Sequence, residues 1–203
     1  MTSILKTLLL VGLLFTPLTA WAIGQPSTSF FVKGLNHPLM VPAHLIALFA
    51  LSLLLGQQGW RAARVVIPVF IIALSSALVM TRYQTATWDA ELTLLPIAAL
   101  TGILVVLKWK LPILLPLCIA ILVAVVIGMD SSVPRIPGLQ SAKIYAHLAG
   151  SGVIVSGLLI IVSAIAFFLR NLLAGVILRV LGAWATAGAI LVVTLLLVTP
   201  VTP

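Results

Sequence analysis

The sequence predicts an all-α integral membrane protein built as a six-helix transmembrane bundle. Of its 203 residues, 63% are hydrophobic and only 7% are charged, which leaves too little polar surface to cover a soluble globule. Six apolar runs are long enough to cross a hydrocarbon core about 30 Å thick at about 1.5 Å per residue. Each run must be helical, because an open strand in lipid would leave its backbone polar groups unpaired.

The chain begins with a segment typical of a bacterial signal peptide. Residues 1–22 combine Lys6, a short apolar stretch and a small-residue A-x-A tripeptide that ends at Ala22. The apolar stretch is shorter than a bilayer requires, so we expect cleavage after Ala22, with a retained N-terminal helix as the alternative. Residues 23–38 are polar and contain Gly, Pro and Ser, which predicts a short external segment.

The rest of the chain, residues 39–203, predicts a single transmembrane domain. Its apolar runs lie at about 39–56, 62–81, 91–109, 111–129, 144–169 and 172–198. Several prolines fall within or at the ends of these runs, but membrane helices tolerate proline where a neighbour satisfies the carbonyl that it frees. The connections are too short for a second domain.

Basic residues predict the orientation of the bundle. The connections after the first, third and fifth runs contain no acid and carry six basic residues: Arg61, Arg64, Lys108, Lys110, Arg170 and Arg179. The opposite side carries four basic residues and all three acids, so the positive-inside rule places the first set in the cytoplasm. We therefore expect a protein of the bacterial inner membrane, with the mature N-terminus and the C-terminus on the periplasmic side.

The distribution of the basic residues also bears on partners. They lie singly or in pairs between apolar runs, as topology determinants do, and form no patch that would bind a polyanion. We expect the lipid bilayer as the partner and no nucleic acid. Other membrane subunits, or further copies of this chain, remain open as partners.

The histidines and acids gather on the predicted outer side. Six residues there are candidate metal ligands: His37, His44, Asp89, Glu91, Asp130 and His147. Imidazole nitrogens and carboxylate oxygens bind borderline divalent metals such as nickel, cobalt or zinc. Acids and histidines in short loops also lie there simply because water is there. His44 differs, because an ionisable group inside a membrane run is costly and usually faces the bundle interior or a pathway.

Two prolines shape the segment that carries the first two histidines. Pro38 and Pro42 are tolerated most easily in a loop or in the first turn of a helix. We therefore expect an irregular segment carrying His37, followed by a helix that carries His44 near its N-terminus. We take these two histidines as the leading metal ligands and the other four residues as secondary ones.

The spacing of His37, Pro38 and His44 resembles a family motif. It matches the H-P-x-x-G-x-D-H that opens the first membrane helix of the HupE/UreJ family, small membrane proteins regarded as nickel or cobalt permeases. Residues 91–112 and 179–188 look like the central and last helices of that family. The resemblance implies a six-helix fold after a signal peptide, with nickel or cobalt as the transported ion.

The chain also departs from the family pattern. Val41 and Ala43 stand where the motif has Gly and Asp, so the carboxylate beside the second histidine is missing. The family's second motif, F-H-G-x-A-H-G-x-E, would fall near residues 127–134, which contain no histidine. The site implied by the resemblance therefore keeps His37 and His44, with Asp130 and His147 as local replacements for the lost ligands.

Two classes of function stay open. One is a divalent-metal permease or an accessory of metal uptake, with no other cofactor expected. The other is a non-transporting structural or assembly subunit of a membrane complex, which would use helix-packing faces of small residues. Such spacing occurs at Gly152 and Ser156, and again at Gly182 and Thr186, although it serves packing within the bundle equally well.

We do not expect an enzyme. The single cysteine, Cys118, lies inside an apolar run, where packing against lipid or helix is its expected role. The sequence also offers no visible pair of nucleophile and base.

Overall fold

The computed structural model of the protein describes residues 29–81, 89–132, 141–170 and 175–198. Apart from caps and short connections, these residues form helices only: α2 (Phe30–Met40), α3 (Pro42–Gln58), α4 (Trp60–Met80), α5 (Ala90–Leu107), α6 (Leu114–Asp130), α7 (Ser141–Leu169) and α8 (Val176–Val198). The predicted all-α class is confirmed for the described part of the chain. The predicted signal peptide, residues 1–22, lies outside it.

The helices have the length and composition of membrane spans. Within the described residues α4, α5, α7 and α8 are each long and apolar enough to cross a bilayer, and α2 with α3 passes the same test as a pair bent by 74°. The remaining helix, α6, is apolar but has only 17 residues. The six predicted runs correspond to α3 through α8, and the predicted count of six crossings is therefore approximate.

Helix α2 corrects one expectation from the sequence. We predicted an irregular segment around His37, whereas residues 30–40 form a helix with Pro38 at its ninth position. Ser29 caps its start, because the backbone N–H of Val32 donates to the Ser29 hydroxyl oxygen at 3.4 Å. Proline in a helix interior is costly unless the carbonyl that it frees finds another donor, and such a donor is present here, as described below.

The bend between α2 and α3 follows from the local sequence. Val41 has extended backbone angles (φ −96°, ψ 106°), and Pro42 occupies the first turn of α3. A residue that precedes proline is pushed out of the helical region, whereas proline itself suits the first turn of a helix. The Val41-Pro42 pair therefore ends one helix and starts the next, and it places His37 and His44 on different helices.

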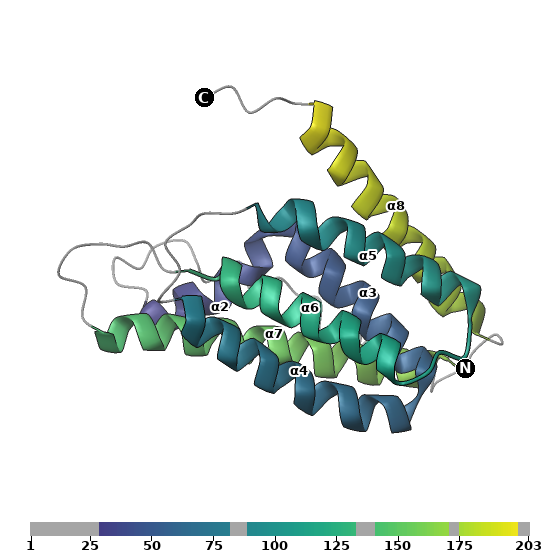
Figure 1. The fold of residues 1–203 in the computed structure, drawn as a ribbon, viewed down its shortest axis with the longest axis horizontal. Coiled ribbons are helices and arrows are strands. Elements are labelled where there is room, and N and C mark those ends of the chain that lie inside the picture. Colours follow the sequence, from purple (N-terminus) through teal and green to yellow (C-terminus); the bar gives the residue numbers. More distant parts are fainter. Residues whose placement is uncertain (1–28, 82–88, 133–140, 171–174, 199–203) are drawn as a thin grey trace, which may run out of the picture.

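Helix α3 lies in the middle of the bundle (Figure 1). It contacts each of the other six described helices, and its side chains are buried along most of its length. The core around it is built from apolar residues of α4, α5, α6 and α7, among them Phe70, Leu94, Ile127 and Leu159. A polar side chain on the inner turns of α3 therefore meets protein rather than lipid.

Helix α8 is the outermost helix. It packs along α5, and its C-terminal part extends beyond the rest of the bundle (Figure 1). The contact with α5 is close at Gly102, where an added Cβ would overlap the Thr186 hydroxyl and lie 2.8 Å from the Gly182 carbonyl oxygen. Gly182 and Thr186, two of the predicted packing residues, thus pack against α5 of the same chain.

Candidate functional site

The three histidines of the chain lie together at one end of the bundle. His37 is on α2, His44 is in the first turn of α3, and His147 is in the second turn of α7. The ring centroid of His37 lies 6.2 Å from that of His44 and 5.9 Å from that of His147, with interplanar angles of 51° and 77°. Two consecutive helices, α2 and α3, and the distant helix α7 thus bring their imidazoles to one place.

A carboxylate completes this group. Asp130, the last residue of α6, places its Oδ2 atom 3.0 Å from Nε2 of His44. The C-terminal end of a helix carries the negative end of the helix dipole, so a carboxylate there gains from a nearby positive charge. The cluster of His37, His44, His147 and Asp130, called the histidine cluster below, therefore combines imidazole nitrogens with one acid.

Neighbouring contacts hold the end of α6 in place. The Thr81 hydroxyl is buried and lies 2.9 Å from the carbonyl oxygens of both Ala77 and Gly128. Gly128 lets α6 approach α4 closely, because an added Cβ would lie 2.6 Å from the Cβ of Ala77. These contacts fix the turn of α6 that presents Asp130 to His44.

Most of the cluster is removed from solvent, and several of its buried ring nitrogens have no hydrogen-bond partner in the described residues. His44 is 0% exposed and His147 is 7% exposed, while His37 is half-buried. Within the described residues four buried ring nitrogens accept or donate no hydrogen bond: Nδ1 of His37, Nδ1 and Nε2 of His44, and Nε2 of His147. The His44 Nε2 atom is near Asp130, but not with the alignment of a hydrogen bond. Buried polar atoms without partners are rare and call for a reason, such as a ligand.

The cluster is not a finished metal cage. Within the described ranges, no group of three or more His, Cys, Asp or Glu side chains is arranged to hold a metal ion. The donor types suit nickel, cobalt or zinc. Ligation would require the side chains to rearrange, and the four buried nitrogens would give up no hydrogen bond in doing so.

The other two predicted ligands lie outside this group. Asp89 directly precedes α5 and is exposed, and Glu91 is in the first turn of α5 and half-buried. In the part of the chain that the structure describes, neither forms an ion pair with a histidine. Of the six predicted candidates, the structure therefore brings together His37, His44, His147 and Asp130.

Two lysines lie near the cluster. The ammonium groups of Lys33 on α2 and Lys143 on α7 lie 5.1 Å and 5.7 Å from the ring centroid of Phe30. Cations held over an aromatic face in this way are stabilised by the ring electrons. They add positive charge beside the start of α7, which opposes the approach of a metal cation.

The predicted packing residues of α7 are more loosely placed than those of α8. Gly152 faces Leu78 of α4, whose Cδ1 atom would lie 3.2 Å from an added Cβ, and Ser156 is half-buried. Gly150 and Ser151 of the same helix make close contact with α2 instead. The sequence shows these two small residues but not their partner.

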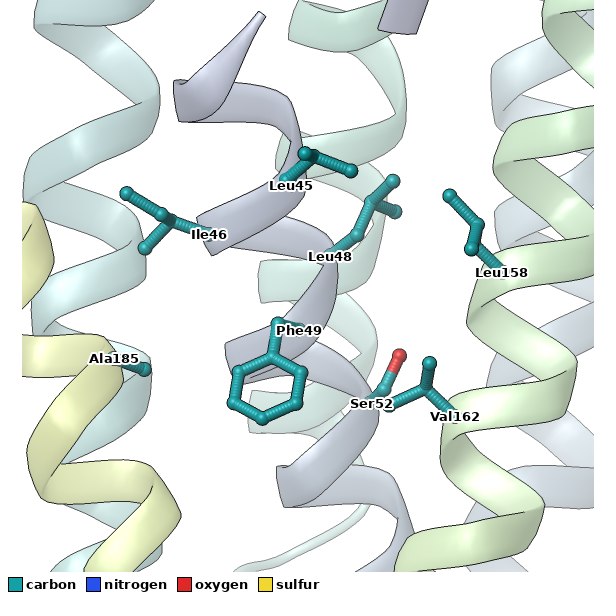
Figure 2. Close-up of a pocket in the computed structure, with 8 residues that line it drawn as sticks. All are labelled: Leu45, Ile46, Leu48, Phe49, Ser52, Leu158, Val162 and Ala185. Carbon is teal, nitrogen blue, oxygen red and sulfur yellow. The ribbon is translucent and has the colours of Figure 1, made fainter. Parts of the chain in front are cut away.

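An apolar cavity of about 360 Å³ opens elsewhere, between α3, α7 and α8 (Figure 2). It is lined by Leu45, Ile46, Leu48, Phe49, Ser52, Leu158, Val162 and Ala185. Only Ser52 among these residues carries a side-chain polar atom, and its hydroxyl lies 3.5 Å from the Leu159 carbonyl oxygen. A metal ion would find no suitable ligands there, so this cavity is separate from the histidine cluster.

The fold and this cluster define a helical membrane protein with a buried group of imidazoles at one end. Comparison with known sequences gives the family: the family model "HupE / UreJ protein" matches residues 9–192, which is nearly the whole chain. The protein belongs to the HupE/UreJ family, which is associated with nickel or cobalt transport and with accessory roles for urease and hydrogenase. No curated protein and no solved structure matches the chain.

Proposed function

We propose that this protein carries a divalent metal ion, nickel or cobalt, through the inner membrane and captures it at the histidine cluster. The observation that supports this most strongly is the set of buried, unpartnered imidazole nitrogens on three helices beside Asp130. Neutral imidazole is the commonest nitrogen ligand for such metals. The family provides the second support.

A cluster whose ligands are not already arranged around one point suits the transport of a metal ion better than its permanent binding. Conduction requires binding that is favourable enough to admit the ion and weak enough to release it. Ligands that must rotate to bind meet that requirement, whereas a closed tetrahedral cage would retain the metal. Asp130 would supply the negative charge that the missing carboxylate at Ala43 supplies in the family motif.

The proposed orientation puts the cluster at the periplasmic end. The basic residues of the α3–α4 and α5–α6 connections, such as Arg61 and Lys110, then lie in the cytoplasm, in accord with the positive-inside rule. Both termini of the mature chain would be periplasmic. An incoming ion would therefore meet His37, His44 and His147 first.

The proposed route onward runs along α3 and α7. It would pass the Ser52 hydroxyl of α3 and the buried Ser163 hydroxyl of α7, which has no partner within the described residues. Near the far end of α3, Oε1 of Gln57 is also buried without a partner. These groups are weak metal ligands, which favours passage over retention. The distance from His44 to Gln57 along the helix is about 20 Å at about 1.5 Å per residue.

One second function has an observation in its favour. The unassembled cluster and the nearby ammonium groups of Lys33 and Lys143 would fit a family member that no longer transports metal and serves as a structural or assembly subunit. In that case the histidines would be dispensable, and a partner subunit would cover the exposed faces of the bundle. In neither case do we propose an enzyme.

The test is metal binding and transport by the purified protein. Nickel and cobalt are titrated calorimetrically into detergent-solubilised wild type, His37→Ala and His44→Ala near pH 7.5, with Asn36→Ala as a control at an exposed neighbour of His37. We expect each histidine variant to lose about 100-fold or more in affinity, since even outer partners of metal ligands are worth about 10- to 100-fold. The control should bind as the wild type does.

Transport is then measured in vesicles that contain the protein and an enclosed metal-sensitive dye. Uptake by the wild type that is lost in His44→Ala supports the permease. Binding without uptake would favour an accessory role in metal capture. Absence of both binding and uptake would refute the proposal, and co-purification of membrane partners would then test the subunit alternative.

A further inference from the structure

The proline inside α2 leaves one backbone carbonyl without its helical donor. Pro38 has no N–H, so the carbonyl oxygen of Gly34, four residues earlier, cannot accept the usual hydrogen bond of an α-helix. The structure shows a replacement from a distant helix. The hydroxyl of Ser151 on α7 donates to this carbonyl oxygen at 3.0 Å, and Ser151 is 1% exposed.

This bond differs from those of several other hydroxyls in the described helices, although the Ser52 hydroxyl of α3 also bonds across to α7. Thr101, Ser131 and Thr194 each donate to the carbonyl four residues earlier in their own helix, at 2.7–2.8 Å. For Ser151 that carbonyl would be the one of His147. The Ser151 hydroxyl bonds across to α2 instead, to the carbonyl that Pro38 has freed.

Two glycines bring the helices close enough for this bond. A Cβ added at Gly34 would overlap the carbonyl oxygen of His147, and one added at Gly150 would overlap the carbonyl oxygen of Phe31. The backbones of α2 and α7 are therefore in direct contact at their crossing. Small residues permit such an approach between membrane helices, and it strengthens polar contacts across the crossing.

The crossing lies one helical turn from the histidine cluster on both helices. Gly34 precedes His37 by three residues, and Ser151 follows His147 by four. We propose that Ser151, by bonding the carbonyl freed by Pro38, is a positioning residue that docks α2 on α7 and so sets His37 against His147 and His44. Its effect on metal binding rests on the function proposed above. We call Gly34, Pro38, Gly150 and Ser151 the α2–α7 clasp.

The clasp assigns a structural role to Pro38, the proline that follows His37. A different residue at position 38 would donate its backbone N–H to the Gly34 carbonyl oxygen within the helix. The hydrogen bond from Ser151 would then no longer be needed to satisfy that carbonyl. The roles of Pro38 and Ser151 are thus predicted to be coupled, although the two residues lie on different helices. A serine that merely fills space would show no such coupling.

A double-mutant cycle tests this coupling in the full chain. Nickel affinity is measured by calorimetry for wild type, Ser151→Ala, Pro38→Ala and the double variant. We expect Ser151→Ala alone to weaken nickel binding about tenfold, in the range of outer partners of metal ligands. In the Pro38→Ala background the same truncation should change affinity by less than about twofold, since the Gly34 carbonyl is then satisfied within α2.

Ser156→Ala is the matched control. It removes the same atom from a half-buried serine five residues further along the same helix, outside the histidine cluster and the proposed route. This variant should bind nickel as tightly as the wild type. An equal loss of affinity from Ser151→Ala in both backgrounds, or the same loss in the control, would overturn the role given to Ser151.

A second readout does not depend on the metal. Hydrogen exchange of peptides from α2 and α5 is followed by mass spectrometry in the same four proteins without nickel. Ser151→Ala should accelerate exchange about tenfold in α2 and leave α5 unchanged, and the double variant should match Pro38→Ala. If the wild type binds no nickel but this pattern holds, the proposed function fails and the clasp stands. Uncoupled exchange overturns the clasp whether or not nickel binds.

Discussion

The two ends of the bundle treat their polar groups differently. At the end opposite the histidines, side chains satisfy the carbonyls at the close of α5 and beyond: Nε2 of Gln57 donates to Val105 at 2.9 Å, Nε2 of Gln58 to Trp109 at 2.8 Å, and Nε of Arg179 to Val106 at 2.9 Å. At the histidine end, four buried ring nitrogens have no hydrogen-bond partner among the described residues.

At one end the polar side chains stabilise the fold, whereas at the other end they are buried without a hydrogen-bond partner. Side chains that cap free carbonyls at a helix end lower the free energy of the fold. Buried imidazoles without partners raise it, and such a cost persists where another role compensates for it. The comparison therefore assigns a stabilising role to the polar side chains at one end and a ligand-binding role to the histidines at the other. This assignment can be tested at either end, and four variants do so.

Among these four variants, the largest effect is expected from Asp130→Asn, which removes the only charge of the cluster that attracts a cation. We expect nickel affinity to fall about 10- to 100-fold, equivalent to about 1.4–2.7 kcal/mol, with little change in thermal stability. Asp89→Asn is the matched control, because Asp89 is exposed and forms no ion pair with a histidine in the described part of the chain. Equal losses in the two variants would mean that only the overall charge of the outer face matters.

An intermediate effect is expected from Gly34→Ala, which would force a methyl group into the carbonyl of His147. Overpacking of this kind costs about 1–3 kcal/mol, so the midpoint of thermal unfolding in detergent should fall. Gly188→Ala is the control, because an added Cβ there meets nothing within 4 Å. Its stability should be unchanged or slightly higher, since alanine is a better helix former than glycine. A similar loss at both positions would show that the crossing of α2 and α7 is less tight than described.

The sequence predicts the membrane helices well because the signal there is local. Apolar runs end where charges and turn residues begin, so the predicted run at 62–81 differs little from α4 (Trp60–Met80), and 144–169 differs little from α7 (Ser141–Leu169). Placement of the ionisable residues on one side of the membrane also suffices to suggest that His44, Asp130 and His147 are near one another.

Long-range contacts are what the sequence does not reveal. The prediction of an irregular segment at His37 was wrong because it considered Pro38 by itself, while the donor that makes the proline tolerable is 113 residues away on α7. The pairing of His44 with Asp130 depends on the close approach of α4 and α6 at Gly128, which no local pattern indicates. Likewise, the predicted outer position of Asp89 and Glu91 suggested ligands that the structure leaves outside the cluster.

The smallest effect is expected at the structural end, from replacing glutamine by methionine of similar length. Gln58→Met removes two hydrogen bonds, the one to Trp109 and the one from the backbone N–H of Leu111 at 3.2 Å, and should lower the free energy of unfolding by about 1 kcal/mol. Gln57→Met removes one hydrogen bond but also a buried oxygen without a partner, so the two changes should nearly cancel. Denaturant titration in detergent measures both.

Nickel affinity should be unchanged in both variants, because neither residue belongs to the histidine cluster. The rate of uptake into vesicles distinguishes them further. If the free Gln57 oxygen lines the proposed route, Gln57→Met slows uptake at unchanged affinity, while Gln58→Met leaves uptake as it is. A loss of affinity in either variant would instead mean that the two ends of the bundle are coupled, and that the division between a stabilising end and a binding end does not hold.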